Sequence, residues 1–192
     1  MQALVVVTYI EDKGLKVSVY CMKALFPGRF QPFHLGHLHA MKKILEKYDS
    51  VLIAIGSSDA SRQRANPFSF DERKEMITGV LRKENILGRC EIVGMPDTPD
   101  DKKWVEEIKK YNFDVVITGN KWTRECLEDD YEIITPDFLE PEKYNATRIR
   151  NIIRLRGDWD FLVPDEIYGF VKRKLGSGEV KIEGAVEKSL DW

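Results

Sequence analysis

The chain contains 192 residues, of which 43% are hydrophobic and 32% charged, enough to form one domain with a substantial core. Its 30 Lys and Arg residues against 32 Asp and Glu residues give a formal net charge of -2. This near-neutral balance excludes a global positive field that would draw the protein onto nucleic acid or a membrane surface. Any phosphate binding must therefore be local.

The apolar run at the N-terminus ends at Glu11 and follows no basic leader, so it predicts neither a signal peptide nor a membrane span. Three cysteines, Cys21, Cys90 and Cys126, are widely spaced and form no Cys-x-x-Cys pair, which argues against a disulfide framework and a zinc site. We expect all three to be small buried hydrophobic side chains. These features favour a cytoplasmic protein with no membrane or nucleic-acid partner.

The first 21 residues predict an added β-hairpin. An apolar segment ends at Tyr9-Ile10, Glu11-Asp12-Lys13-Gly14 supplies the turn, and residues 15–20 alternate apolar and polar side chains. The strand that begins at Met22 could itself open a complete domain. Residues 1–21 are therefore either an appendage, which could extend an interface, or upstream sequence.

From residue 22 to residue 175, short apolar runs alternate with longer amphipathic ones, which is typical of a parallel sheet joined by crossover helices. The expected strands are 22–27, 51–56, 90–94, 114–118 and 131–135. The expected helices are 35–48, 69–84, 101–111, 121–128, 145–156 and 164–175. The second helix begins at a capping box, Ser69 to Glu72, and Pro164 opens the last one.

The predicted fold class is therefore α/β. We expect a Rossmann-like doubly wound parallel sheet with C-terminal helices and an extra N-terminal β-hairpin. Residues 22–175 would form the domain and residues 176–192 an irregular tail.

The clearest chemical signal is the loop between the first strand of this sheet and the first helix. It follows Phe26 and lies at the carboxyl edge of the sheet, where α/β folds bind ligands. Gly28 permits a close backbone approach to a phosphate, and the helix that starts near His34 directs N–H groups to the same point. The loop therefore predicts a phosphate site.

His34 and His37 are three residues apart, so in a first helical turn they share a face and can both reach one polyphosphate. Gly36 has no side chain, so no bulky group stands between the two histidines. Read alone, the pair could also be half of a metal site or plain surface. A metal would need further ligands, and His39, the remaining histidine, faces elsewhere. No protein metal site is expected.

Residues 28–37, Gly-Arg-Phe-Gln-Pro-Phe-His-Leu-Gly-His, resemble the signature of the archaeal-type nicotinamide-mononucleotide (NMN) adenylyltransferases, members of the HxGH nucleotidyltransferase superfamily. The resemblance extends over about residues 22 to 175. It implies an enzyme of pyridine nucleotide biosynthesis that transfers an adenylyl group from ATP to NMN, giving NAD and pyrophosphate. It also implies Mg²⁺ carried by the substrate phosphates, and a homo-oligomer.

Further landmarks of the family recur in order. Asn66-Pro67-Phe68 is followed at close range by Glu72-Arg73. Residues 145–150 resemble the family's Ser-Gly-Thr-x-x-Arg motif at a helix N-terminus. Asn145 can cap this helix, while Thr147 and Arg150 offer donors to the β- and γ-phosphates. Arg148 points to a different face of the helix.

The resemblance implies roles for individual residues. The catalytic residues would be His34, His37, Arg29 and Arg150, all as stabilisers of phosphate charge and not as bases. The ATP-binding residues would be Gly28, Arg29, Phe30, His34, Gly36, His37, Gly119, Asn120, Thr147 and Arg150. The acceptor-binding residues would be Ser57, Arg62, Arg64 and Trp104.

Within this last set, Trp104 would contact the nicotinamide side, and the two arginines would hold the acceptor phosphate. Without the family, Trp104 would be a core residue and the arginines part of a solvated loop.

The sequence departs from the family pattern at several positions. Asn145-Ala146 replaces Ser-Gly, Ser61-Arg62 stands where Ser-His is usual, and no proline follows Gly119-Asn120. The ATP-side elements are intact while the acceptor-side elements vary, so the reaction type is better supported than the acceptor. A flavin, phosphopantetheine or polyol phosphate acceptor stays open. So does a regulator that binds the nucleotide without turnover.

Overall fold

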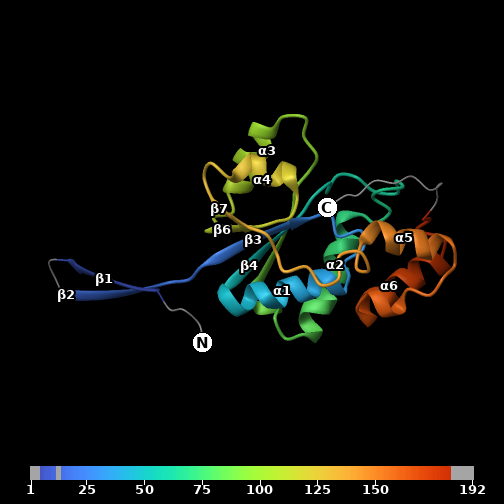
Figure 1. Ribbon diagram of the computed structural model, residues 1–192, viewed down its shortest axis with the longest axis horizontal. Coiled ribbons are helices and arrows are strands. Elements are labelled where there is room, and N and C mark those ends of the chain that lie inside the picture. The colour runs from blue at the N-terminus through green and yellow to red at the C-terminus, as the bar shows by residue number, and fades with distance from the viewer. Residues whose placement is uncertain (1–4, 12–13, 183–192) are drawn as a thin grey trace.

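The computed structural model describes the backbone of residues 5–11 and 14–182, with side chains from residue 21 onward. Strands β1 (Val5–Glu11) and β2 (Gly14–Tyr20) pair antiparallel as a separate two-stranded sheet, with Val7 opposite Ser18. This hairpin extends away from the rest of the fold (Figure 1). The extra N-terminal hairpin is therefore confirmed. Most of the tail predicted at 176–192 lies outside the described residues.

The main sheet has five parallel strands in the order β5-β4-β3-β6-β7. Its strands are β3 (Lys23–Gly28), β4 (Ser50–Ile55), β5 (Cys90–Gly94), β6 (Val115–Ile117) and β7 (Glu132–Ile134). The helices are α1 (Leu35–Lys47), α2 (Phe70–Lys83), α3 (Asp101–Lys109), α4 (Lys121–Leu127), α5 (Ala146–Arg154) and α6 (Asp165–Gly176). Short 3₁₀ helices at Leu87–Arg89 and Asp160–Leu162 were not expected.

Helices cover both faces of this sheet (Figure 1), so the doubly wound α/β class is confirmed. Because successive strand residues point to opposite faces, Leu25 and Val116 pack under α3 and α4 in one core cluster. Phe26 and Ile53 belong to the larger cluster with α1, α2, α5 and α6. Central strands buried on both faces explain why the sequence shows continuous apolar runs there.

The strand order reverses at β3. The chain passes from β3 to β4 and β5 on one side, and then crosses to β6 and β7 on the other. The connections therefore diverge at the carboxyl end of β3, which opens a crevice of the kind in which α/β folds bind ligands. The loops after β3, β4, β5 and β6 converge on that crevice.

Two local expectations were wrong. Cys21 is exposed, because it lies in the short link between β2 and β3 and not in the core, whereas Cys90 and Cys126 are half-buried. Pro164 is the N-cap of α6, and the first helical residue is Asp165. None of the helices that the structure describes is long and apolar enough to cross a membrane.

Candidate active site

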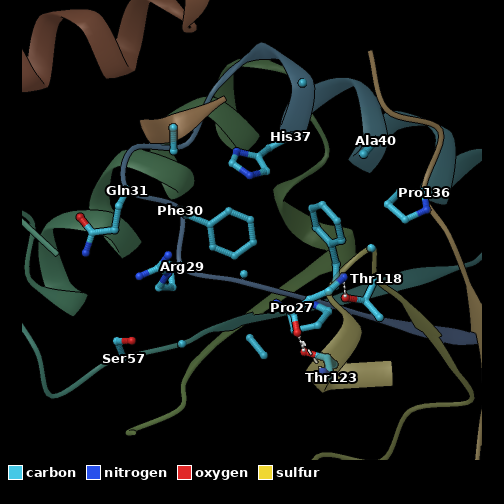
Figure 2. A pocket seen from close by; sticks show the side chains of 18 of the residues that line it. Pro27, Arg29, Phe30, Gln31, His37, Ala40, Ser57, Thr118, Thr123 and Pro136 are labelled. Carbon is cyan, nitrogen blue, oxygen red and sulfur yellow. Dashed lines mark hydrogen bonds between the residues drawn. The ribbon is translucent and has the colours of Figure 1, made fainter. Parts of the chain in front are cut away.

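A cavity of about 680 Å³ occupies the crevice at the carboxyl ends of β3, β4, β5 and β6, a size typical of sites for small molecules. Figure 2 shows Arg29, Phe30 and His37 on one part of its wall and Thr118 and Thr123 on another. All of the predicted ATP-binding residues line it, namely Gly28, Arg29, Phe30, His34, Gly36, His37, Gly119, Asn120, Thr147 and Arg150. Ser57 and Trp104 line it as well.

His34 and His37 form a capping box at the start of α1. The His37 backbone N–H donates to Nδ1 of His34 at 3.3 Å, and the His34 backbone N–H donates to Nδ1 of His37 at 3.2 Å. The two rings stack with their centroids 3.6 Å apart. Both imidazoles are thus fixed by the helix terminus that they cap.

These contacts determine the charge and tautomer of both rings. Burial, and then the neighbouring His37, lowers the pKa of His34 well below 6.5, and burial lowers the pKa of His37 to about 3. Because each Nδ1 accepts a backbone N–H, each neutral ring carries its proton on Nε2. Both residues line the cavity, so they can offer it neutral N–H donors.

We expect NMR of the ligand-free protein to show these rings as neutral Nε2–H tautomers. Because burial disfavours the imidazolium, acidification from pH 8 to about pH 5 should leave the His37 ring neutral, with its proton on Nε2 and none on Nδ1. Long-range ¹H–¹⁵N correlation spectra of the imidazoles measure this directly. A titration of His37 near pH 6.5, or an Nδ1–H tautomer, would contradict the capping geometry.

The ring of Phe30 explains why residue 28 is a glycine. A Cβ added at Gly28 would lie 2.9 Å from Cζ of Phe30, which is shorter than a normal van der Waals contact. Phe30 is buried with a φ of 51°, a strained value for a bulky residue, and its ring packs edge-on to His37 at 4.9 Å between centroids. Gly28 was predicted to admit a phosphate, but the contact that the structure shows is with this aromatic ring.

We expect Gly28→Ala to destabilise the protein by about 1–3 kcal/mol, because the new methyl group overpacks a buried ring. Adding Phe30→Leu should recover part of the loss, so a double-mutant cycle measured by urea unfolding would show coupling between the two positions. Strictly additive effects would instead support a Gly28 requirement set by the ligand alone.

The second element predicted to bind phosphate is the N-terminus of α5. Asn145 caps it by accepting the Arg148 backbone N–H at 3.1 Å, as predicted. Arg150 is buried and donates to the Gln31 carbonyl oxygen at 2.7 Å and to Oγ1 of Thr147 at 3.0 Å. Arg148 is exposed and donates to the Glu142 carbonyl oxygen, so the two arginines do lie on different faces.

Gln31 links this element to the Asn66-Pro67-Phe68 segment. Its side-chain amide donates to the Phe68 carbonyl oxygen at 2.8 Å and accepts the Phe68 backbone N–H at 3.0 Å. The loop after β3 is therefore held from both sides, by Phe68 and by Arg150. Hydrogen bonds thus join three segments that lie far apart in the sequence, and two of them contribute Gln31 and Arg150 to the cavity wall.

Aromatic and acidic side chains also line the cavity. Trp104 is buried and meets Trp122 edge-on, with 4.7 Å between ring centroids, and both line the cavity. Trp122 donates its indole N–H to Asp101 at 3.1 Å. Ser57, which has a φ of 49°, donates its hydroxyl to Asp97 at 2.9 Å.

The turn after β6 also lines the cavity. Asn120 caps α4 by accepting the Thr123 backbone N–H at 2.9 Å (Figure 2). A Cβ added at Gly119 would lie 2.7 Å from the Phe138 ring, which also lines the cavity. Gly119 is thus a site of close packing against an aromatic side chain.

Two of the predicted acceptor residues are not brought to the cavity. Arg62 forms a bidentate salt bridge with Glu72, at 2.6 and 2.8 Å, and also donates to the Pro67 carbonyl oxygen. This pair raises the pKa of Arg62. Arg64 is exposed. Neither belongs to the cavity wall, so a role for them in acceptor binding remains a prediction that would require the loop to move.

Comparisons with known proteins agree with this geometry. The cytidylyltransferase-like family model matches residues 25–164. The nicotinamide-nucleotide adenylyltransferase of Pyrobaculum arsenaticum is 36% identical over 172 residues, covering 86% of this chain and 96% of the relative. That of Saccharolobus solfataricus is 40% identical over 153 residues, covering 78% and 89%.

The chain belongs to the nicotinamide-nucleotide adenylyltransferase family. A solved bifunctional NMN adenylyltransferase/ADP ribose pyrophosphatase from Francisella tularensis, complexed with AMP and a Mn ion, superposes with a TM-score of 0.69 at 26% identity. The match covers 81% of this chain and 49% of that longer one.

In this member of the nicotinamide-nucleotide adenylyltransferase family, several cavity residues escaped sequence reasoning. They are Gln31, Asp97, Trp122 and Phe138. Asp97 and Phe138 lie in irregular loops whose course no local pattern predicts. Trp122 stands two residues after the Gly119-Asn120 landmark, so its position close to that turn was the available signal.

Proposed function

We propose that this protein transfers the adenylyl group of ATP to the phosphate of NMN, giving NAD and pyrophosphate. The observation that carries the proposal is that the two elements predicted to bind phosphate, the His34-His37 cap and the Thr147-Arg150 helix terminus, line one cavity together with aromatic and acidic side chains. Membership of the nicotinamide-nucleotide adenylyltransferase family supports the same reaction.

In the proposed reaction, a phosphate oxygen of NMN forms a bond to the α-phosphorus of ATP. The bond from that phosphorus to the bridging oxygen of the β-phosphate breaks, and pyrophosphate leaves with the electron pair. The second pKa of a phosphate monoester is about 6, so the nucleophile is already largely a dianion at neutral pH. No general base is needed.

Catalysis then depends on position and on charge stabilisation. His34 and His37 donate neutral Nε2–H groups to phosphate oxygens without themselves titrating. Arg29 and Arg150, which both line the cavity, supply fixed positive charge. Because these donors are held by helix caps and backbone contacts, little reorganisation accompanies the reaction.

The aromatic and acidic side chains of the cavity match the chemistry of the acceptor NMN. The nicotinamide ring of NMN is a pyridinium cation, and the faces and edges of Trp104 and Trp122 offer it aromatic contacts. Asp97, which also lines the cavity, adds negative charge. A neutral flavin ring would gain nothing from that charge, which is why we place NMN here.

A divalent cation fits this site through the substrate. Within residues 21–182, no group of three or more His, Cys, Asp or Glu side chains could hold a metal ion. We propose that Mg²⁺ enters with ATP and neutralises charge on the leaving pyrophosphate, bound by phosphate oxygens and water. We further propose residues 22–175 as the catalytic domain of a cytoplasmic homo-oligomer.

The test is an acceptor comparison. ATP and Mg²⁺ are supplied with NMN, flavin mononucleotide, phosphopantetheine or a polyol phosphate, and pyrophosphate release is measured beside NAD formation. We expect turnover with NMN, and none in a His34→Asn/His37→Asn double variant purified in the same way. ATP binding without turnover on any acceptor would instead indicate a regulator, and turnover on another acceptor would reassign the substrate.

A further inference from the structure

Arg73 is a buried cation that the proposed reaction does not use. It lies in the first turn of α2, as part of the Glu72-Arg73 landmark, and is 0% exposed. Among the side chains that the structure describes, it is the largest that is fully buried. Burial of an arginine destabilises the folded protein unless its charge is balanced and all its N–H donors are hydrogen-bonded.

Its guanidinium binds main-chain carbonyl oxygens. One nitrogen, Nη1, donates to Arg29 at 2.8 Å and to Gly56 at 2.7 Å, and Nη2 donates to Ser57 at 2.9 Å. Nε donates to Ser69 at 3.2 Å. Three of these four carbonyls belong to the loops after β3 and β4, which form the floor of the cavity.

Among the described residues, no carboxylate lies within salt-bridge distance of this cation. Within the described part of the chain, Arg73 takes part in none of the salt bridges, including the nearby pair of Arg62 and Glu72. Burial lowers the pKa of Arg73 to about 10, Asp97 acts in the opposite direction, and the positive charge of Arg29 lowers the pKa further. A neutral hydrogen-bond donor could hold the same loops in place with a smaller desolvation penalty. The positive charge of Arg73 therefore requires an explanation of its own.

We propose that Arg73 is a positioning residue whose buried charge is balanced by the polyphosphate of the bound nucleotide. Its guanidinium donates to the main-chain carbonyl oxygens of Arg29 and Ser57, two residues that line the cavity. An anion in the cavity can therefore interact electrostatically with Arg73 without direct contact. The same four hydrogen bonds hold the Arg29 loop and the strained Ser57 in place. This inference rests on the proposed use of ATP.

The test measures ATP-Mg²⁺ binding by calorimetry between about pH 7 and pH 9. Arg73→Gln removes the charge and should weaken ATP binding by about tenfold or more, from Coulomb's law at an effective dielectric near 20. Arg73→Lys keeps a charge that burial makes easy to neutralise, because desolvation lowers the pKa of a buried ammonium by several units. Its ATP affinity should therefore fall as pH rises, toward that of Arg73→Gln.

The wild-type protein should show no such trend. The phosphates of ATP are ionised throughout this range, the pKa of the Cys90 thiol is raised to about 11, and the imidazoles of His34 and His37 stay neutral. Arg82→Gln and Arg82→Lys are matched controls, since Arg82 lies on the same helix but is exposed. Both should bind ATP as the wild type does.

A purely structural role predicts a different result. If Arg73→Gln folds and binds ATP within about twofold of the wild type, the charge is irrelevant and the inference is overturned. If Arg73→Gln does not fold, the pH profile of ATP binding by Arg73→Lys decides, because a neutral lysine amine can be buried at pH 9 with little loss of stability. An Arg73→Lys profile parallel to that of the wild type overturns the inference. Wild-type protein that binds no ATP contradicts the proposed function itself.

Discussion

Replacing His37 with alanine is expected to lower kcat by about 10²–10³-fold, with a much smaller loss of ATP affinity. The reason is that His37 contributes a fixed neutral N–H donor, whose contact strengthens as negative charge develops on the phosphates in the transition state. Steady-state kinetics combined with equilibrium ATP binding separates the two effects. Equal losses of rate and affinity would mean that His37 binds ground state and transition state alike.

Alanine also removes the acceptor that caps α1, so matched variants are needed. Asparagine can place an acceptor near the position of Nδ1, and glutamine can place a donor near that of Nε2. We expect His37→Asn to keep the stability of the helix terminus but not the rate. His37→Gln can still accept the His34 backbone N–H through its amide oxygen, and it should keep more of the rate than His37→Asn. The opposite order would assign the kinetic effect to helix capping.

Replacing Arg150 with alanine is expected to lower kcat/KM by about 10³-fold or more, because a fixed guanidinium on a transferring phosphoryl group is among the largest single contributions known for this chemistry. The same change leaves the buried Gln31 carbonyl without its donor, which should cost about 1–3 kcal/mol of stability. Arg150→Lys keeps the charge but cannot reproduce the two-pronged contact with Gln31 and Thr147. It should recover only part of the rate.

Arg148→Ala is the control on the same helix. This side chain is exposed and donates to a loop carbonyl, so its removal should change kcat/KM by less than about threefold. Chemical denaturation of each variant separates stability from rate. If Arg148→Ala and Arg150→Ala lost activity equally, the buried position of Arg150 would have no special role.

The sheet, the helices and the phosphate loop were predictable because their signals are local. Strand alternation, the capping box at Ser69 and the His34-x-x-His37 spacing each act over a few residues, and the observed element bounds lie within two residues of those expected. The convergence of all predicted ATP-binding residues on one cavity follows from the parallel topology, since carboxyl ends of strands meet at one edge.

What sequence reasoning missed depends on tertiary partners. A basic residue such as Arg62 in a polar loop is usually solvated, and only the folded chain brings it to Glu72. Arg73 on an amphipathic helix would likewise be taken for a surface residue, yet it is fully buried. The ring of Phe30 over Gly28 is invisible in a motif that suggests phosphate approach. In each case the deciding contact joins residues that no spacing rule connects.

The capping box of α1 sets a limit on how far this protein can be stabilised without losing its activity. Serine, threonine, aspartate and asparagine are the strongest N-caps, and a glutamate three residues later completes the most favourable box. Here both positions are histidines that face the cavity. Sequence changes that optimise this helix terminus for thermal resistance would remove the two proposed phosphate donors, so under the proposed function selection for stability and selection for turnover oppose each other at these positions.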